Sequence, residues 1–159
     1  MSNDTNRYQE FEVALEKVIP KKYIYTELAV RFAYGTDASC YRYIPKIVVR
    51  AKNEAEVKGI IALAEAHLVP ITFRASGTSL SGQTSSDSVL VLLGDDFVGG
   101  SVTDYGLKIR LLPMTIGQNA NNLLKPYGRK IGPDPATINT ARIGGIASNN
   151  SSGMCCGTN

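Results

Sequence analysis

The feature that most constrains the fold is a loop of small residues between two runs of strand-forming residues. Residues 70–74 (PITFR) favour a strand, residues 75–88 are mostly Gly, Ser and Thr, and residues 89–93 (VLVLL) favour another strand. Small residues allow main-chain N–H groups to come close to an anion. The loop is therefore a candidate phosphate-binding site.

The loop departs from both common nucleotide-binding motifs. Residues 77–84 (GTSLSGQT) have the glycine spacing of the P-loop, but Gln83 stands where that motif needs Lys, and a strand rather than a helix follows. The GxGxxG fingerprint is also incomplete, because Ser79 occupies its second glycine position. A phosphate site of another kind is expected.

The composition of the 159-residue chain is that of an ordinary soluble protein, which predicts one domain or part of a larger one. The net charge of +3 comes from basic residues spread along the chain, so nucleic acid is not an expected partner. No apolar run has the length of a membrane span, and the first six residues are polar, unlike a signal peptide. The expected location is the cytoplasm, with peripheral attachment of the complete protein to the inner face of the membrane as a further option.

The three cysteines fit neither a disulfide framework nor a zinc site. We expect reduced thiols and no metal site, although the adjacent Cys155 and Cys156 lie beside glycines and could instead serve redox chemistry or contact a cofactor.

Hydrophobic spacing predicts helices and a βαβ unit in the first half of the chain. A first helix runs to the break at Pro20, a second is capped by Thr26, and a third begins at a capping box of Asn53 and Glu56. Strands over 47–50 and 70–74 flank the third helix, so they form a parallel pair. The expected buried positions of the first and third helices are Tyr8, Phe11, Leu15, Val18, Ile19, Val57, Ile60, Ile61, Ala64 and Leu68. The only histidine, His67, lies at the end of the third helix, where a structural role explains it better than catalysis.

The pattern changes after the loop. Strands over 101–105 and 107–111, with glycines at the turns, indicate antiparallel pairing. Thr115 and Gln118 predict a capping box for a further helix, closed by Gly128. Residues 131–137 contain two prolines and are expected to be irregular, whereas the small residues of 143–153 permit close approach to a flat ligand. No closing helix or strand is predicted before Asn159, so we expect the N-terminal portion of a longer protein.

Two separate segments of small residues suggest a ligand with phosphates at one end and a ring system elsewhere, such as a dinucleotide. Residues 70–82 (PITFRASGTSLSG) resemble the pyrophosphate loop of FAD-dependent oxidases and dehydrogenases of the vanillyl-alcohol oxidase / p-cresol methylhydroxylase type. Residues 131–135 (IGPDP) and 143–158 (IGGIASNNSSGMCCGT) resemble the second and third FAD-contacting segments of that family. The resemblance runs from about Tyr34 to Asn159 and is greatest for the D-lactate and glycolate dehydrogenase branch.

The resemblance implies an α+β FAD-binding domain of two subdomains that is incomplete at its C-terminus. One subdomain has a small parallel sheet with helices, and the other has an antiparallel sheet with helices. We expect an N-terminal helical segment over 1–34, a first subdomain from 35 to about 86 and the start of a second over 87–159. The change from parallel to antiparallel pairing is expected near Ser88.

The resemblance also implies which residues bind FAD. Backbone N–H groups from Ser76 to Ser79 and the hydroxyls of Thr78 and Ser79 would bind the pyrophosphate. The expected cofactor-binding residues are Arg74, Ala75, Ser76, Gly77, Thr78, Ser79, Gly82, Gln83, Pro133, Asp134, Gly144, Gly145, Ala147, Asn149 and Ser152. Relatives that attach FAD covalently through this loop have His where this chain has Thr78, so non-covalent FAD is expected.

For some of these residues a structural interpretation stays open. Arg74 could equally be a surface cation at a strand end, and Asp134 could cap a turn. Tyr34, Asp37 and Tyr41 are expected to serve packing and turn hydrogen bonds.

The function implied is that of an FAD-linked oxidoreductase oxidising a 2-hydroxy acid, such as D-lactate or glycolate, by hydride transfer to flavin. Its catalytic residues and substrate-binding cap domain are expected beyond Asn159, so this portion alone is expected to be inactive. Two alternatives stay open: the same fold acting on an alcohol, an ether-lipid precursor or a sugar nucleotide, and a non-catalytic nucleotide-binding or assembly module.

Overall fold

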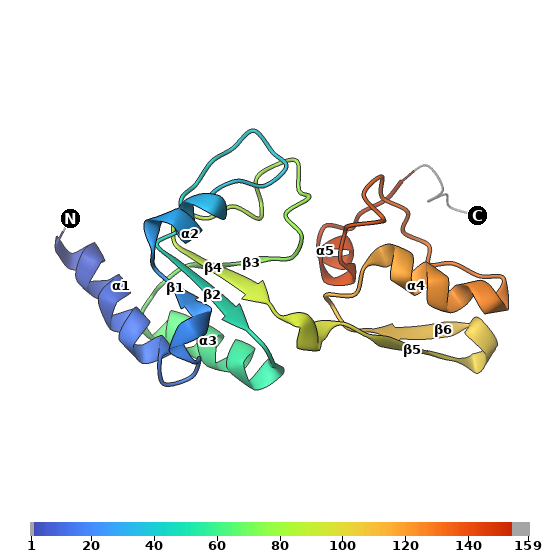
Figure 1. Cartoon of the computed structure of the whole chain (residues 1–159), viewed down its shortest axis with the longest axis horizontal. Helices are drawn as coiled ribbons and strands as arrows, with labels where there is room; N and C mark the ends of the chain where they lie inside the picture. Colours follow the sequence, from blue (N-terminus) through green and yellow to red (C-terminus); the bar gives the residue numbers. More distant parts are fainter. Residues whose placement is uncertain (1, 154–159) are drawn as a thin grey trace. The chain divides into compact units, whose positions relative to one another are not determined.

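The computed structural model describes residues 2–153 of the chain (Figure 1). They belong to two compact units, Met1–Gly94 and Asp95–Asn159. The units divide after strand β4 (Val89–Leu93), whereas the boundary expected near residue 86 lies before that strand. Within residues 2–153, no helix is long and apolar enough to cross a membrane.

The first unit contains a mixed four-stranded sheet with the strand order β1-β2-β4-β3. Strand β1 (Ile24–Tyr25) is antiparallel to β2 (Ile47–Ala51), while β2 and β3 (Ile71–Arg74) are both parallel to β4. The predicted strands of the βαβ unit are therefore parallel, but they are not neighbours, because β4 lies between them. The change to antiparallel pairing falls after β4 and not near Ser88.

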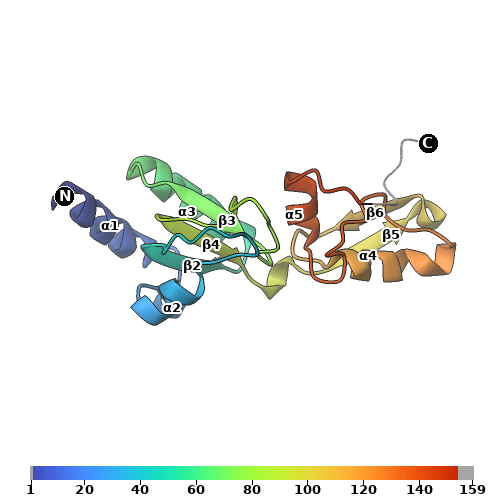
Figure 2. The same ribbon diagram turned by 90° about the horizontal axis from the view of Figure 1, so that it is seen from above.

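Helices cover both faces of this sheet (Figure 2). Helices α1 (Ser2–Leu15) and α3 (Glu54–Ala66) pack on the face that carries Val49 and Val91, and α2 (Leu28–Ala33) lies on the face that carries Val48 and Leu90. Burial on both faces explains why β4 is a continuous apolar run and why β2 is apolar except at Arg50. A separate helical segment is expected over 1–34, but residues 2–34 contribute helices α1 and α2 and strand β1 to this unit, and Phe11 is completely buried in its core.

The capping-box-like start expected for α3 is confirmed at Asn53, and Glu56 reaches back to the residue before the N-cap. The Asn53 side-chain oxygen accepts the Glu56 N–H at 2.9 Å, and the Glu56 carboxylate accepts the Lys52 N–H at 2.7 Å. Two of the residues predicted to be buried along this helix are exposed, so the prediction is wrong for them. Ile61 is 45% exposed, and Leu68, which follows the end of the helix, is 77% exposed.

The ends of the first two helices differ slightly from expectation. Helix α1 ends at Leu15, several residues before Pro20, and α2 begins after Glu27 and not after Thr26. His67 forms the C-terminal cap of α3, where its ring meets the ring of Phe11 edge to face at 5.9 Å, in agreement with a structural role.

The second unit contains the predicted antiparallel hairpin and two helices. Strand β5 (Gly100–Thr103) pairs with β6 (Lys108–Leu111), and helices α4 (Gly117–Leu124) and α5 (Ile143–Ser148) follow. The capping box predicted at Thr115 is wrong: the N-cap of α4 is Ile116, and the Thr115 hydroxyl donates to the Gly99 carbonyl at 2.8 Å and accepts the Gly99 N–H at 2.9 Å. Short 3-10 turns occur at Lys21–Tyr23, Asp95–Phe97, Asp104–Gly106 and Lys125–Tyr127, the last closed by Gly128 in the left-handed conformation.

Candidate functional site

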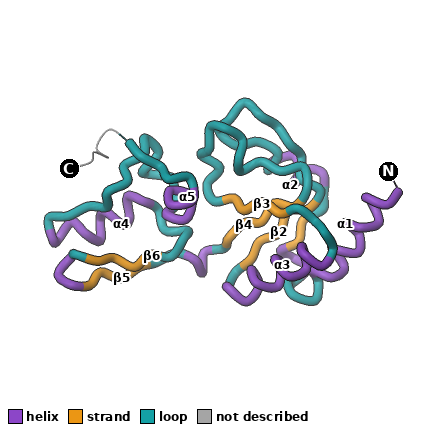
Figure 3. The backbone as a smooth tube through the Cα atoms, turned by 180° about the vertical axis from the view of Figure 1, so that it is seen from behind, coloured by secondary structure: helices purple, strands orange, loops and turns teal. Residues whose placement is uncertain are grey.

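The glycine- and serine-rich loop, residues 75–88, leaves the carboxyl end of the parallel strand β3 and runs beside the segment 34–46 (Figure 3). The carboxyl ends of parallel strands are where α/β sheets commonly bind ligands. Gly77 and Gly82 have φ angles of 67° and 77°, in the left-handed region that favours glycine. Both glycines therefore have a conformational reason to be at these positions.

Three consecutive N–H groups of this loop are available to a ligand. Among residues 2–153, no protein group accepts the N–H of Gly77, Thr78 or Ser79. The Gly77 carbonyl, in contrast, accepts the Ala38 N–H at 2.9 Å. Successive unpaired N–H groups in a turn with a left-handed glycine can bind an anion without lysine or a metal ion.

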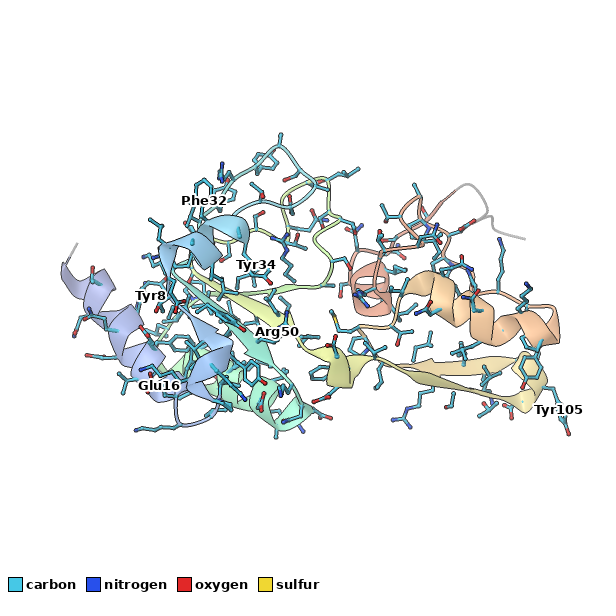
Figure 4. The ribbon with its side chains drawn as sticks, in the orientation of Figure 1. Tyr8, Glu16, Phe32, Tyr34, Arg50 and Tyr105 are labelled. Carbon is cyan, nitrogen blue, oxygen red and sulfur yellow. The ribbon has the colours of Figure 1, made fainter. Side chains whose placement is uncertain are left out.

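The Arg74 side chain lies under the loop. Its Nη1 donates to the Tyr34 carbonyl at 3.0 Å, and its guanidinium lies 5.7 Å from the centre of the Tyr34 ring, which packs between α2 and the sheet (Figure 4). A Cβ added to Gly77 would lie 2.5 Å from Arg74 Nη2. Burial lowers the pKa of Arg74 while the charge of Asp37 opposes this shift, and an arginine in a protein stays charged in either case.

The Asp37 carboxylate joins the segment 34–39 to the loop. One oxygen accepts the N–H and hydroxyl of Ser39, and the other accepts the Thr84 hydroxyl at 2.8 Å. Burial tends to raise the pKa of Asp37, but the hydrogen bonds from Ser39 and Thr84 and the charge of Arg74 together hold it below its ordinary value. The turn role expected for Asp37 is confirmed.

Tyr41 contacts the loop, as expected, although its side chain is 48% exposed. Its ring lies against the second left-handed glycine of the loop, because a Cβ on Gly82 would be 2.7 Å from Tyr41 Cδ2. The ring also stacks on Tyr43 at a centroid distance of 6.5 Å.

In the second unit, α5 presents a surface of small and amide side chains. The Gly144 N–H donates to the Pro113 carbonyl at 2.8 Å, and a Cβ at Gly144 would be 2.8 Å from Pro113 Cβ, so this glycine allows close packing of the helix. Ile146 is buried on the inner side. The outer side exposes Gly145, Ala147 and Asn149.

The two segments that flank α5 meet within the second unit. A Cβ on Gly153 would overlap the Asp134 carbonyl, so residues 151–153 lie directly against residues 134–135. The Asp134 carboxylate lies 3.8 Å from Lys130 Nζ, and Pro133 and Ser152 are exposed. As predicted, residues 131–137 contain no helix or strand.

The structure thus gathers the expected cofactor-binding residues into two groups, 74–83 in the first unit and 133–152 in the second. Sequence reasoning missed Thr84, whose partner lies 47 residues away and leaves no local signal. Across residues 2–153, no group of three or more His, Cys, Asp or Glu side chains is arranged so that it could hold a metal ion. Cys155 and Cys156 fall outside the described residues.

Comparison with known proteins identifies the family. Residues 45–159 match the family described as FAD binding domain. D-2-hydroxyglutarate dehydrogenase of Haemophilus influenzae is 29% identical over 137 residues, covering 82% of this chain and 13% of that protein. Glycolate oxidase subunit GlcD of Bacillus subtilis is 30% identical over 129 residues, covering 79% of this chain and 27% of that protein. The chain spans less than a third of the length of these relatives.

Solved structures agree on the fold. Alkyldihydroxyacetonephosphate synthase has a TM-score of 0.73 at 18% identity, covering 91% of this chain and 30% of that one. p-Cresol methylhydroxylase has a TM-score of 0.71 at 13% identity, covering 92% of this chain and 30% of that one. The expected α+β fold is therefore confirmed as part of a larger FAD-binding fold. Because the family match covers most of the chain and includes both groups of expected site residues, the chain belongs to the family described as FAD binding domain.

Proposed function

We propose that the chain is the cofactor-binding portion of an FAD-dependent dehydrogenase that oxidises a 2-hydroxy acid. The observation that carries this proposal is the run of three available N–H groups, Gly77 to Ser79, after a parallel strand in a member of an FAD-binding family. The relatives named D-2-hydroxyglutarate dehydrogenase and glycolate oxidase support the substrate class, because both names specify a 2-hydroxy acid. D-lactate and glycolate are the first substrates to test.

The pyrophosphate of FAD is the part that this loop would bind. The N–H groups from Ser76 to Ser79 and the hydroxyls of Thr78 and Ser79 would donate to its oxygens. Arg74 adds a permanent positive charge under the loop, which favours an anion above it. Ala75, Gly82 and Gln83 complete the loop surface around the phosphates.

The remaining expected residues would line the adenosine and flavin portions. They are Pro133, Asp134, Gly144, Gly145, Ala147, Asn149 and Ser152. The exposed small side chains on α5 leave the main chain accessible to a flat ring, and the Asn149 amide offers both a donor and an acceptor.

Bound FAD would supply the two-electron acceptor that takes a hydride from the hydroxyl-bearing carbon of the substrate. The residues of this chain hold and orient the cofactor, and the groups that bind substrate and accept its proton are assigned to the rest of the protein. Thr78 lacks the nucleophilic ring nitrogen of a histidine, so we propose that FAD is held without a covalent bond. A cytoplasmic location is part of the proposal, and the exposed free thiol of Cys40 is consistent with a reducing compartment.

Purification of the complete protein tests the proposal. We expect a yellow protein that releases its flavin into the supernatant on acid precipitation, and that reduces a dye with glycolate, D-lactate or D-2-hydroxyglutarate. A simple alcohol serves as the negative control substrate. Flavin that stays with the precipitated protein would contradict non-covalent attachment.

The same experiment separates the alternatives. Bound flavin without activity on any 2-hydroxy acid would favour a different substrate on the same fold. Absence of flavin, together with no thermal shift on adding FAD, would contradict the proposed enzyme and favour a non-catalytic module.

A further inference from the structure

The conformation of the loop is maintained by the neighbouring segment 34–39. Three hydrogen bonds connect the two segments or the strand end below them: Arg74 Nη1 to the Tyr34 carbonyl at 3.0 Å, the Ala38 N–H to the Gly77 carbonyl at 2.9 Å, and the Thr84 hydroxyl to Asp37 Oδ2 at 2.8 Å. They involve Arg74 at the end of β3, Gly77 near the start of the loop and Thr84 further along it. The loop is thereby held at Gly77 and Thr84, and the strand end that leads into it is held at Arg74.

Asp37 is the only member of this arrangement whose charge opposes an anionic ligand. Both of its oxygens accept hydrogen bonds from the protein, from Ser39 on one side and Thr84 on the other. Its charge is also balanced by the attraction of Arg74. Both oxygens of the Asp37 carboxylate are therefore engaged by protein groups, so its role is to hold the loop and not to contact a ligand.

The Arg74 guanidinium is likewise directed at protein groups. It is half-buried, donates to the Tyr34 carbonyl, and packs so closely under Gly77 that no Cβ fits between them. This contact fixes the left-handed turn from which the available N–H groups of residues 77–79 follow.

We propose that Asp37, together with Thr84 and Arg74, is a positioning device that holds residues 75–84 in the cofactor-binding conformation before FAD arrives. The inference rests on the proposed function of the loop and adds the residues that support it. Asp37 and Thr84 act through the loop without touching FAD, and the contribution of Arg74 to binding is indirect. A loop that is ordered in advance binds more tightly, because its conformational entropy is not lost on binding.

Substitutions at Thr84 test this device in the complete protein. Thr84→Val keeps the shape of the side chain and removes the hydroxyl, whereas Thr84→Ser keeps the hydroxyl. Asp37→Asn removes the charge but leaves an amide with which the Thr84 hydroxyl can still pair. Thr103→Val, on the exposed strand β5 of the other unit, is the matched control.

Two readouts are needed: the Kd for FAD, from quenching of flavin fluorescence, and amide hydrogen exchange in the FAD-free protein. For Thr84→Val we expect a Kd raised about ten-fold and faster exchange confined to residues 75–84. Asp37→Asn should show a smaller change in the same direction. Thr84→Ser and Thr103→Val should match the wild type in both readouts.

Three results would overturn the inference. The first is an unchanged Kd in Thr84→Val. The second is weaker FAD binding with unchanged exchange of the FAD-free loop, which would mean that Thr84 contacts the cofactor itself. The third is faster exchange across β2 and β4 as well, which would indicate general destabilisation. A wild-type protein that does not bind FAD would instead refute the proposed function, and exchange in the FAD-free variants would still report whether Asp37 and Thr84 hold the loop.

Discussion

Replacing Gly77 with alanine should weaken FAD binding strongly, for two separate reasons. The φ angle of 67° at this position costs a non-glycine residue about 1–2 kcal/mol. The new Cβ would also lie 2.5 Å from Arg74 Nη2, so the guanidinium must shift, and we expect this shift to break its hydrogen bond to the Tyr34 carbonyl. Loss of that partly exposed hydrogen bond adds about 1 kcal/mol. The sum of about 2–3 kcal/mol corresponds to a Kd for FAD raised about 30- to 150-fold.

A matched glycine in the second unit separates the two causes. Gly128 has a φ angle of 65°, but a Cβ there would meet nothing within 4 Å. Gly128→Ala should therefore lower the free energy of unfolding by about 1 kcal/mol through backbone strain alone and leave the Kd for FAD unchanged.

Titration of both variants with FAD, followed by flavin fluorescence, gives the comparison, and thermal unfolding checks that both are folded. A Gly77→Ala variant that binds FAD within two-fold of the wild type would refute the reasoning. That result would mean that the left-handed turn and its contact with Arg74 do not shape the binding site.

Three further predictions concern the core, a buried polar contact and acid pH. Phe11→Ala removes a completely buried ring and should lower the free energy of unfolding in urea by about 3–5 kcal/mol, whereas a loss below 1 kcal/mol would contradict its place in the core. Thr115→Val leaves the Gly99 N–H without its partner, while the Gly99 carbonyl keeps the Leu112 N–H, and should cost about 1–3 kcal/mol in thermal unfolding, with Thr115→Ser close to the wild type. Because the pKa of Asp37 is lowered in the folded protein, its support of the loop is complete above the ordinary value of 3.8 and is lost as the pH falls through the folded-state pKa. The difference in Kd for FAD between the wild type and Asp37→Asn should therefore become smaller as the pH falls through the folded-state pKa of Asp37. A difference that stayed constant over this range would mean that the charge of Asp37 does not support the loop.

Local sequence patterns predict most elements of this fold but not the order of its strands. The capping box at Asn53 and the alternation over 107–111 identify their elements because each signal lies within a few residues. The apolar runs of β2 and β4 indicate buried strands, yet nothing in such a run specifies its neighbours, so the position of β4 between β2 and β3 was not predicted. Strand β1, with two residues, is too short to give a pattern.

The candidate site shows the same division between local and distant information. The composition of 75–88 predicts the loop, whereas its support by Asp37 depends on a contact across 47 residues. Helix α5 was missed because Gly144 and Gly145 disfavour a helix. Tertiary contacts outweigh that preference, since Ile146 is buried and the Ile143 and Gly144 N–H groups are bound by carbonyls of residues 113–115.

The most direct test of the central claim is amide hydrogen exchange of the complete protein with and without FAD. If the N–H groups after the left-handed turn bind the pyrophosphate, FAD should slow exchange at residues 76–79 more than at any other part of the loop. The β5–β6 hairpin provides the internal reference, with no change expected. Flavin binding that leaves exchange at 76–79 unaltered would contradict the account.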